Sequence, residues 1–512
     1  MLRAYRSHDI RQAEVPLLAA GTPLMQRAAA ATAFETVAEL RRRGNGISGT
    51  SVLALVGAGN NGGDALFAAA RLAQRGMQVS ALCLGSCHEQ GLAAARRARV
   101  RIHSLDEATG GSSEFIESLA LPAVVWLDGL VGIGARGALR EPMATLVESL
   151  EEVRRMRAHE PITIAIDVPT GVGSDDGVVV GPALHADVTV TMGASKPGLI
   201  LDPGCRYAGQ VVEVPLGIEE FLPPEPALLS LSEADVLDLW DIPGPSSHKY
   251  TRGVVGLMTG SDSYPGAALL SAGAALAAGP GMVRYAGPKD VRRMVIARYP
   301  EIVTAPGRVQ CWVIGSGMDM AETEAAAEAA RRLQESVADG FPVVLDAGAI
   351  ELAVETDLPS TVVLTPHAGE LAQLLTGRGE VTTRADVENA PAKYARIAAT
   401  LTGATILLKG SVDIACGPDD PLYAQGGAPA WRGVAGAGDV QAGLLGAMLA
   451  GWGDELAELG QGRGIPARIA AAASWVHGRA AHIAAGPGRG RPITASQISA
   501  AIGSAIGDAL AN

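Results

Sequence analysis

Residues 52–64 read Val-Leu-Ala-Leu-Val-Gly-Ala-Gly-Asn-Asn-Gly-Gly-Asp, an apolar run that ends in a glycine-rich loop. A strand that ends in Gly-x-Gly and turns into a helix leaves backbone N–H groups free at the positive end of the helix dipole, which favours phosphate binding. A second loop of this kind, Gly-Ala-Gly-Asp at residues 436–439, directly precedes a helical pattern over residues 440–450. Two such loops in different sequence contexts predict a fused enzyme with two active sites.

The length, charge and cysteine content of the chain limit the classes of function that it can have. The 512 residues exceed what one hydrophobic core usually serves, so we expect two or more domains. A net charge of −13, without a basic run that contains aromatic residues, argues against nucleic acid and favours small-molecule work in solution. The N-terminus lacks the apolar core of a signal peptide, and the most apolar stretches contain Gly, Pro or Asp439, so we expect neither export nor a membrane span. The cysteines show no disulfide or metal-ligand spacing, which predicts a reducing cytoplasm; they are Cys83, Cys87, Cys205, Cys311 and Cys416.

Short apolar runs alternate with helical patterns in both halves, as expected of parallel sheets covered by helices. A leading helical pair over residues 9–40 precedes the runs of the first half, which are 52–56, 79–84, 124–127, 162–166, 188–192 and 211–214. The runs of the second half are 254–258, 313–314, 343–345, 362–364, 406–408 and 414–415. Helical patterns lie between them at residues 65–75, 142–156 and 321–339. The clustered prolines of residues 221–226 predict a boundary between two α/β domains, residues 1–222 and 228–512.

Three polar segments follow strands of the first half, where open α/β sheets bind ligands. They contribute Asp128, then Asp167 with Thr170, and Lys196. Each residue alone has a plain alternative, since an aspartate can cap a turn and a lysine can be a solvated surface charge. Together they offer two carboxylates, a lysine and a hydroxyl in one crevice, which suits proton transfer beside a bound phosphate or cation.

These segments resemble the NAD(P)HX epimerase domain over most of residues 1–220, including the helix that contains Leu24–Ala29. The resemblance implies a Rossmann-like three-layer α/β/α fold that interconverts the R and S epimers of hydrated NADH and NADPH. It places Asp167 at the nicotinamide end and Lys196 near the reaction centre as catalytic residues, and assigns potassium to Asn61, Asp128 and Thr170. The implied substrate-binding residues are Asn60, Asn61, Gly62, Gly63, Asp64, Gly132 and Gly134. The chain departs from the family pattern at Ala65, Ile133, Ala135, Arg136 and, conservatively, Thr170.

The second half carries its own set of polar residues around the Gly-Ala-Gly-Asp loop. Asp439 sits near a helix start, His367 follows one strand, and Lys409 begins a turn after another. The plain alternatives are a helix-capping aspartate, a structural histidine and a surface turn. The functional interpretation, which the surrounding segments favour, is a nucleotide site at the helix N-terminus with Asp439 as a base for a substrate hydroxyl.

This half resembles the ribokinase-like superfamily, and within it the ADP-dependent NAD(P)HX dehydratases, over roughly residues 228–510. The segments that carry the resemblance are 248–253, 260–268 and 313–318, in addition to those around His367, Lys409 and Asp439. The resemblance implies that Gly317, His367 and Asp439 contact the hydrated nucleotide, that Asp439 is the catalytic base, and that magnesium offsets phosphate charge. The implied ADP-binding residues are Lys409, Gly410, Ser411, Val412, Asp413 and Gly438. Ala437 replaces the threonine that is usual in the family.

Both resemblances indicate one damaged cofactor. We therefore predict a fused, cytoplasmic, homo-oligomeric repair enzyme that epimerises R-NAD(P)HX and dehydrates the S form at the expense of ADP, with NADHX and NADPHX as substrates. The alternative is a ribokinase-like small-molecule kinase fused to a non-catalytic nucleotide-binding module. Asp167 and Lys196 argue against the binding module, because a module needs the glycine loop but not this pair. The His367 segment and the nature of the N-terminal partner argue against the kinase.

Overall fold

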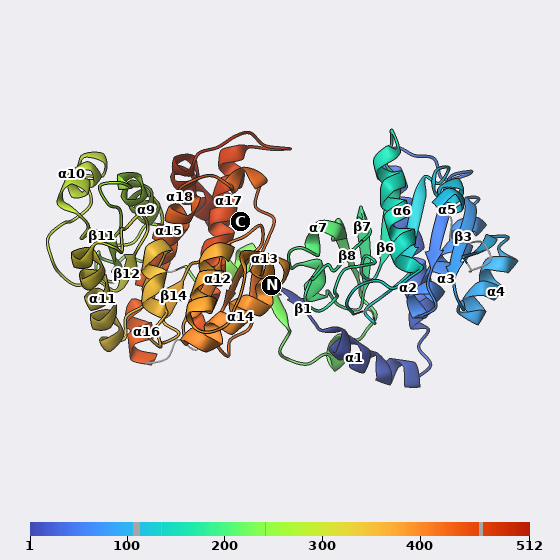
Figure 1. Cartoon of the computed structure of the whole chain (residues 1–512), viewed down its shortest axis with the longest axis horizontal. Coiled ribbons are helices and arrows are strands. Elements are labelled where there is room, and N and C mark those ends of the chain that lie inside the picture. The colour runs from blue at the N-terminus through green and yellow to red at the C-terminus, as the bar shows by residue number, and fades with distance from the viewer. Residues whose placement is uncertain (106–112, 135, 241, 460–463, 512) are drawn as a thin grey trace. The chain divides into compact units, whose positions relative to one another are not determined.

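The protein is described here from a computed structural model that covers residues 1–105, 113–134, 136–240, 242–459 and 464–511. The chain divides into two compact units, Arg3–Ala227 and Leu228–Asn512, the second of which also includes Met1–Leu2. Figure 1 shows the elements of both units along the chain.

The N-terminal unit is built on a twisted parallel sheet. Among its described residues, the sheet has the strand order β4-β3-β2-β5-β6-β7-β8. The strands are β2 (Ser51–Val56), β3 (Gln78–Leu84), β4 (Arg101–Leu105), β5 (Val125–Gly129), β6 (Ile162–Ile166), β7 (Val188–Met192) and β8 (Gln210–Val214). The chain runs from β2 outward to β4 and then returns to β5 on the other side. A ligand crevice is therefore expected at the carboxyl ends of β2 and β5.

Helices cover both faces of this sheet. One apolar core joins alternate residues of β2, such as Val52, to α1 (Ser7–Ala19), α2 (Leu24–Arg42), α3 (Asn60–Gln74) and α4 (Glu89–Arg97). The other core joins Leu53 and Leu55 to α5 (Ser113–Ala120) and α6 (Met143–Met156). Because strand residues alternate between faces, the apolar and buried residues 52–56 of β2 require a helical layer on each side. The unit is thus the three-layer α/β/α fold that was predicted.

The C-terminal unit has a larger, mixed sheet. Its strand order over the described residues is β1-β9-β17-β16-β15-β14-β13-β12-β10-β11. Strands β10 to β15 are parallel, and β15, β16 and β17 form an antiparallel meander. The bounds are β1 (Leu2–Ala4), β9 (Leu228–Ser230), β10 (Val254–Met258), β11 (Met282–Tyr285), β12 (Cys311–Ile314), β13 (Val343–Leu345), β14 (Val362–Leu364), β15 (Thr405–Leu408), β16 (Asp413–Cys416) and β17 (Tyr423–Gln425).

An alanine-rich helical layer covers one face of the second sheet. It consists of α9 (Pro265–Ala277), α15 (Ala437–Gly451), α17 (Ile465–Ala485) and α18 (Ala495–Ala511). Helix α15 is buried on nearly all sides, and a Cβ added at Gly443 would lie 2.2 Å from the Ser271 carbonyl oxygen. Small residues therefore let α15 pack closely against α9. On the other side, α11 (Thr323–Ala338) and α14 (Pro391–Thr402) contact β12 and β15.

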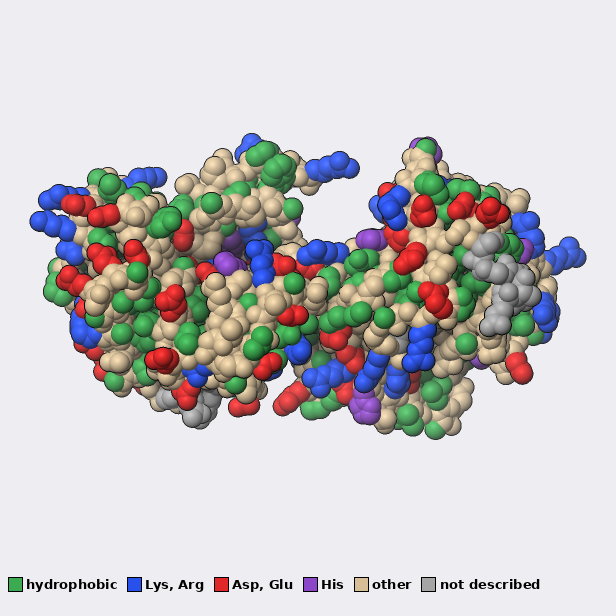
Figure 2. Space-filling view, in the orientation of Figure 1, with side chains coloured by type: hydrophobic (Ala, Val, Ile, Leu, Met, Phe, Trp, Pro, Cys, Tyr) green, Lys and Arg blue, Asp and Glu red, His purple; other side chains and the backbone are tan. Residues whose placement is uncertain are grey.

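The structure differs from the sequence expectations mainly at element ends. Helix α3 begins at Asn60 and α15 at Ala437, so the polar residues expected in loops form first helical turns. Strands β1, β4, β9, β11 and β17 were not predicted, because each is short or has an apolar pattern that polar residues interrupt. No helix of the described residues is long and apolar enough to cross a membrane. On the face drawn in Figure 2, Lys and Arg side chains are interspersed with Asp and Glu.

Candidate active sites

The glycine loop of the N-terminal unit combines close packing with free backbone donors. A Cβ at Gly57 would lie 1.8 Å from the Leu130 carbonyl oxygen, and one at Gly62 would lie 1.9 Å from that of Gly57. These two glycines are required by packing. Gly59 faces open space, and the N-terminus of α3 has no side-chain cap. The first-turn N–H groups of α3 are therefore available to an anion.

A pocket of about 650 Å³ opens in front of this helix start. Of the predicted residues, Asn60, Asn61, Asp64, Gly132, Gly134 and Asp167 line it, together with Arg11 and Glu14 of α1. Gly62 and Gly63 are buried in the first turn of α3 and do not line the pocket. The Arg11 side chain donates a 2.7 Å hydrogen bond to the Ile133 carbonyl oxygen, which holds α1 to the loop that departs from the family pattern. Ala135 of that loop lies outside the described residues.

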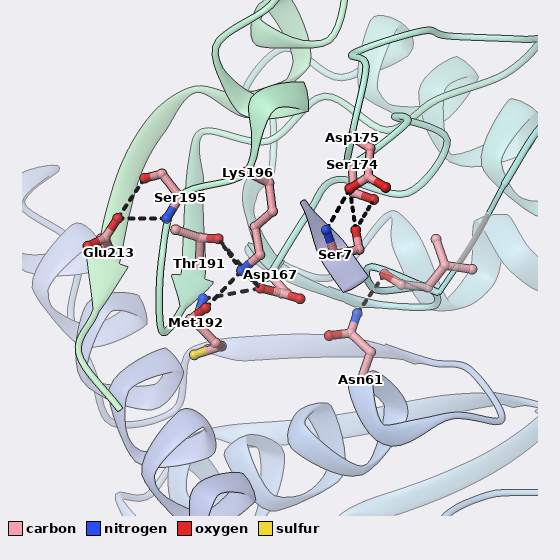
Figure 3. Close-up of polar contacts among 11 residues, drawn as sticks. Ser7, Asn61, Asp167, Ser174, Asp175, Thr191, Met192, Ser195, Lys196 and Glu213 are labelled. Atoms are coloured by element: carbon pink, nitrogen blue, oxygen red, sulfur yellow. Dashed lines mark hydrogen bonds and ion pairs between the residues drawn. The ribbon is translucent and has the colours of Figure 1, made fainter. Parts of the chain in front are cut away.

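Asp167 is fixed by a fully buried lysine. Its Oδ1 accepts hydrogen bonds from the Lys196 ammonium and from the backbone N–H of Met192, the latter at 3.1 Å (Figure 3). Lys196 Nζ also donates to Thr191 Oγ1 and to the Met192 carbonyl oxygen, each at 2.8 Å, and its side chain is 0% exposed. All three ammonium protons are thus used within the protein. Lys196 orients Asp167 through this ion pair and does not itself line the pocket.

The backbone at Asp167 adds to this positioning. Asp167 has a φ of +72°, a left-handed conformation that is costly for a residue with a Cβ. It directly follows β6, whose last residue is Ile166. The turn directs the carboxylate toward the pocket, where its side chain is 13% exposed. A strained aspartate at a strand end is typical of a functional site.

Asp128 and Thr170 form a buried oxygen-rich pair that does not line the pocket. Asp128 accepts hydrogen bonds from Thr170 Oγ1 at 2.6 Å and from the Thr170 N–H at 2.8 Å. Burial raises the pKa of Asp128 to about 6, although these hydrogen bonds act in the opposite direction. Asn61 donates from Nδ2 to the Val131 carbonyl oxygen at 2.7 Å, so its own amide oxygen is directed away from that contact.

Glu14 is a pocket residue that sequence reasoning missed. It lies half-buried on α1, and burial together with the charge of Asp167 raises its pKa. The start of α1 is anchored by Ser7, whose N–H and hydroxyl donate to Asp175 at 2.7 and 2.6 Å (Figure 3). The sequence carried no signal for Glu14, because one glutamate in a charged amphipathic helix is usually a solvated residue.

The C-terminal site is built around the start of α15. Gly436 is the N-cap, with a φ of 87° and no side-chain cap; the Ala437 N–H donates to the Val434 carbonyl oxygen at 3.2 Å, and the next N–H groups of the turn, beginning at Gly438, are left for a ligand. Asp439 lies in this turn. Burial and the charge of Asp346, partly offset by Lys409, raise the pKa of Asp439 to about 6. A carboxylate with a pKa in this range serves as a general base near neutral pH.

Lys409 connects this helix start to a second buried acid. Its Nζ lies 2.7 Å from Asp346 Oδ1, and a Cβ at Gly438 would come within 3.2 Å of that nitrogen. The Lys409 side chain is 17% exposed. Burial lowers the pKa of Lys409, but Asp346 and Glu370 more than compensate, so the pKa is raised. The lysine is therefore charged beside the free amides of α15.

Asp346 was not among the predicted site residues. It directly follows β13 and is 2% exposed. It accepts hydrogen bonds from Ser316 Oγ and Thr365 Oγ1, each at 2.7 Å. Burial acts to raise its pKa, but Lys409 and these hydrogen bonds hold the pKa below its ordinary value. A signal existed in the sequence, because Asp346 follows a strand in the same way as Asp167.

The turn after Lys409 is held by Asp413. Asp413 is buried and accepts from the Gly410 N–H at 2.9 Å, from Arg432 at 2.8 Å and from Gln441 Nε2 at 3.0 Å. These contacts occupy both carboxylate oxygens, so Asp413 shapes the turn from inside. Val412 is also buried, whereas Gly410 and Ser411 are exposed.

His367 and Gly317 are the two remaining residues predicted for the C-terminal site, and different features fix their positions. His367 is the N-cap of α12 (Ala368–Gly377): its Nδ1 accepts from the N–H groups of Gly369 and Glu370 at 3.0 and 3.1 Å, and Glu370 accepts from the His367 N–H. The imidazole is 58% exposed and its strand-end backbone pairs with Lys409. Gly317 has a φ of +66°, and a Cβ there would lie 2.5 Å from that of Ala267.

These features define an α/β enzyme class with two separate sites, each at the carboxyl ends of parallel strands and beside a free helix N-terminus. Residues 21–198 match the family model described as YjeF-related protein N-terminus, and residues 255–502 match the model of NAD(P)H-hydrate dehydratase. The chain is 38% identical over 524 residues to the bifunctional NAD(P)H-hydrate repair enzyme Nnr of Mycobacterium leprae, with 99% of each chain covered.

Two further similarities concern single halves of the chain. The NAD(P)H-hydrate epimerase of Microbacterium testaceum is 42% identical over 222 residues, which cover 43% of this chain and 80% of the relative. An ADP/ATP-dependent NAD(P)H-hydrate dehydratase from Bacillus subtilis, crystallised with ATP and Mg²⁺, is 24% identical, with a TM-score of 0.46 over 54% of this chain and 97% of that one.

The chain belongs to the family of bifunctional NAD(P)H-hydrate repair enzymes, which combine an epimerase and a dehydratase domain. This membership confirms the predicted fold class and enzyme class.

Proposed function

We propose that the N-terminal site interconverts the R and S epimers of NADHX and NADPHX. The observation that carries this proposal is Asp167, which is fixed by buried Lys196 at a pocket whose other wall is the free start of α3. Phosphate groups of the substrate would contact the first-turn amides at Asn60 and Asn61 and the loop at Gly132 and Gly134. Asp167 would face the hydrated ring and move a proton there.

Asn61, Asp128 and Thr170 would hold potassium in this site. The buried carboxylate of Asp128 has no basic side chain among the groups that shift its pKa, and hard oxygen ligands suit such a cation. When bound, the ion would supply positive charge beside the substrate. Asp128 would stay ionised in its presence and keep Thr170 in place through the two hydrogen bonds.

In the C-terminal site, Lys409 and the first-turn amides at Gly438 would hold the phosphates of ADP, with Gly410 and Ser411 at the exposed turn beside them. Asp439 would take the proton of the substrate hydroxyl as that oxygen accepts a phosphoryl group. Loss of inorganic phosphate from the phosphorylated substrate, together with a proton from the neighbouring ring carbon, then restores the double bond of the dihydropyridine. Magnesium would accompany the nucleotide and offset phosphate charge; among the described residues no group of three His, Cys, Asp or Glu is arranged to hold a metal.

Gly317 and His367 would contact the hydrated nucleotide at the rim of this site, and Val412 and Asp413 would support the ADP-binding turn from below. We also propose that the enzyme acts in the cytoplasm as a homo-oligomer and accepts ADP in preference to ATP. A small-molecule kinase would release a phosphorylated product, and the absence of such a product would distinguish the proposed dehydratase from that alternative.

The test is recovery of reduced-nicotinamide absorbance after the protein, ADP and Mg²⁺ are added to a mixed R/S preparation of NADHX, with ATP in a parallel run. We expect rapid recovery from both epimers. The Asp167→Asn variant should recover only the S form rapidly, because the remainder then depends on spontaneous epimerisation. No recovery with either nucleotide would contradict the dehydratase assignment, and rapid R-epimer turnover by Asp167→Asn would contradict the epimerase assignment.

A further inference from the structure

Asp64 is poorly suited to the phosphate-binding role that the family resemblance implied. It lies on α3, lines the pocket, and its Oδ1 is buried without a hydrogen-bond partner in the described part of the chain. Burial and the charges of Asp167 and Glu14 raise the pKa of Asp64 well above its ordinary value. A carboxyl group in these surroundings is protonated more readily than usual, and an approaching phosphate would raise that tendency further.

Asp167 has the opposite character in the same pocket. Its Oδ1 is committed to the buried Lys196 ammonium, whose charge it must balance. The second oxygen of Asp167 points away from that lysine in Figure 3. Asp64 has an Oδ1 without a partner among the described residues, whereas Asp167 is ion-paired with Lys196, and two carboxyl groups in such different surroundings are the usual basis for acid and base roles in one site.

We propose that Asp64 and Asp167 are an acid–base pair that epimerises the substrate by removing and re-adding water, an inference that rests on the proposed epimerase function. Hydration of a dihydropyridine leaves the hydroxyl on the ring carbon beside the nitrogen. Protonated Asp64 gives its proton to this hydroxyl, the C–O bond breaks to release water, and the nitrogen lone pair forms a C=N⁺ bond. A second water adds to the other face of that carbon, and its proton goes to the Asp167 carboxylate.

Glu14 completes the cycle. After one conversion Asp64 is ionised and Asp167 is protonated, so a proton must return before the same direction can run again. Glu14 lies close enough to both for the charge of Asp167 to raise its pKa and for its own charge to raise that of Asp64. It also lines the pocket. Glu14 is therefore placed to carry the returning proton, and is not required for the bond changes themselves.

The test follows the substrate oxygen. The full-length protein is incubated with R-NADHX in H₂¹⁸O without ADP or ATP, so that no dehydration occurs. The epimers are then separated, and the mass of each is measured by mass spectrometry. We expect one ¹⁸O atom in each S-epimer molecule formed by the protein, above the spontaneous exchange in a protein-free sample. Epimerisation that retains ¹⁶O would overturn the proposal, because a route that opens the ring at the C–N bond keeps the original oxygen.

Variants test the residues separately. Asp64→Asn should slow epimerisation by at least about 100-fold, a typical loss for a general acid. ADP-dependent dehydration of S-NADHX should be unchanged, and the substrate KM should change less than kcat. Glu89→Gln, at an exposed acid of α4 outside the pocket, is the matched control and should behave as wild type.

Epimerisation by Asp64→Asn within about threefold of wild type would overturn the role of Asp64, a bound well below the smallest general-acid contribution. If Asp64→Asn does not fold, the isotope result with the wild-type protein still decides the route. A wild-type protein that interconverts no epimers would contradict the epimerase function itself, which is a different result from epimerisation with retained oxygen.

Discussion

Both sites place a lysine–aspartate pair beside a glycine loop and a free helix start, yet the two lysines are used differently. Lys196 is 0% exposed, and its ammonium group donates hydrogen bonds to Asp167, Thr191 and the Met192 carbonyl oxygen, which uses all three of its protons. Lys409 is 17% exposed, and within the described residues its Nζ donates a hydrogen bond to Asp346 Oδ1. In the first site the acid of the pair faces the pocket and the lysine stays behind it. In the second the acid is buried and the lysine lies at Gly438.

The difference shows that a lysine near a glycine loop is not by itself a phosphate ligand. The role of the lysine depends on how many of its ammonium N–H donors are left after those that bond to groups of the protein. Lys196 acts as a positioning residue for a carboxylate, whereas Lys409 retains donors for an anion. The two acids that we propose as catalytic differ in the same way, since Asp167 is ion-paired with Lys196, whereas Asp439 makes no hydrogen bond to a basic side chain within the described residues.

The largest expected effect comes from removing the unpaired acid of the second site. Asp439→Asn should lower the dehydration rate by about 10²–10⁴-fold, because the base for the substrate hydroxyl is lost. Epimerisation should be unchanged. Rates with ADP and S-NADHX measure the effect, and Glu455→Gln, at an exposed acid of α16 (Gly453–Leu459), is the control. Near-normal dehydration by Asp439→Asn would mean that another group is the base.

The same assignment has a pH signature. Since burial raises the pKa of Asp439 to about 6, and only its ionised form accepts a proton, kcat/KM for dehydration should fall about tenfold per unit below that pH. A profile that stays flat down to pH 5 would contradict the role of Asp439.

The two lysines provide the next test. Either Lys196→Met or Lys409→Met leaves a carboxylate without its buried partner, which costs about 3–5 kcal/mol of local stability. Hydrogen exchange of the full chain measures this loss in each unit.

Lys196→Met should lower the epimerase kcat with little change in KM, whereas Lys409→Met should weaken ADP binding in calorimetry. Lys289→Met removes an exposed lysine and is the control; equal effects of the two buried variants on ligand affinity would contradict the comparison.

A smaller effect is expected from potassium. If Asn61, Asp128 and Thr170 bind this ion, replacing lithium by potassium should stabilise the N-terminal unit by about 2.7 kcal/mol at 100 times the dissociation constant. In a unit of this size that is about 2–4 °C in Tm for each kcal/mol. The Asp128→Asn variant should melt at the same temperature in both salts. A wild-type protein without cation dependence would exclude potassium binding at these residues.

The smallest effect concerns His367. Because its imidazole accepts two backbone N–H groups at the start of α12, His367→Ala should cost about 1 kcal/mol of stability through loss of the cap. His367→Asn keeps a capping side chain and should restore that stability. If His367 also contacts the substrate, both variants should raise the KM for S-NADHX to a similar degree; an effect confined to the alanine variant would leave His367 as a helix cap alone.

Much of the site was readable in the sequence, for a physical reason. Residues at or just after the carboxyl ends of parallel strands lie along the same edge of a sheet, so local patterns could locate Asp128, Asp167 and Lys196 at the first sheet. The same holds for His367 and Lys409 at the second sheet. Asp346 obeys the same rule and was within reach. The helix starts at Asn60 and Ala437 were placed too late, because glycine and asparagine lower the helix propensity of a turn that packing stabilises.

Glu14 could not be found in this way. It comes from α1, far from the strand ends in sequence, and reaches the pocket only because Ser7 and Arg11 anchor that helix to residues more than one hundred positions away. The burial that shifts the pKa values of Asp64, Asp128 and Asp439 is likewise a product of long-range packing.

The sequence by itself determined the two α/β units, the two glycine loops and the order of the chemical groups, since these depend on periodicity and on residues adjacent along the chain. Only the tertiary structure decided which lysine donors remain free, which carboxylates are paired, and which lie in a pocket. Charge states and free hydrogen-bonding groups depend on neighbours in space, and those neighbours come from distant segments of the chain.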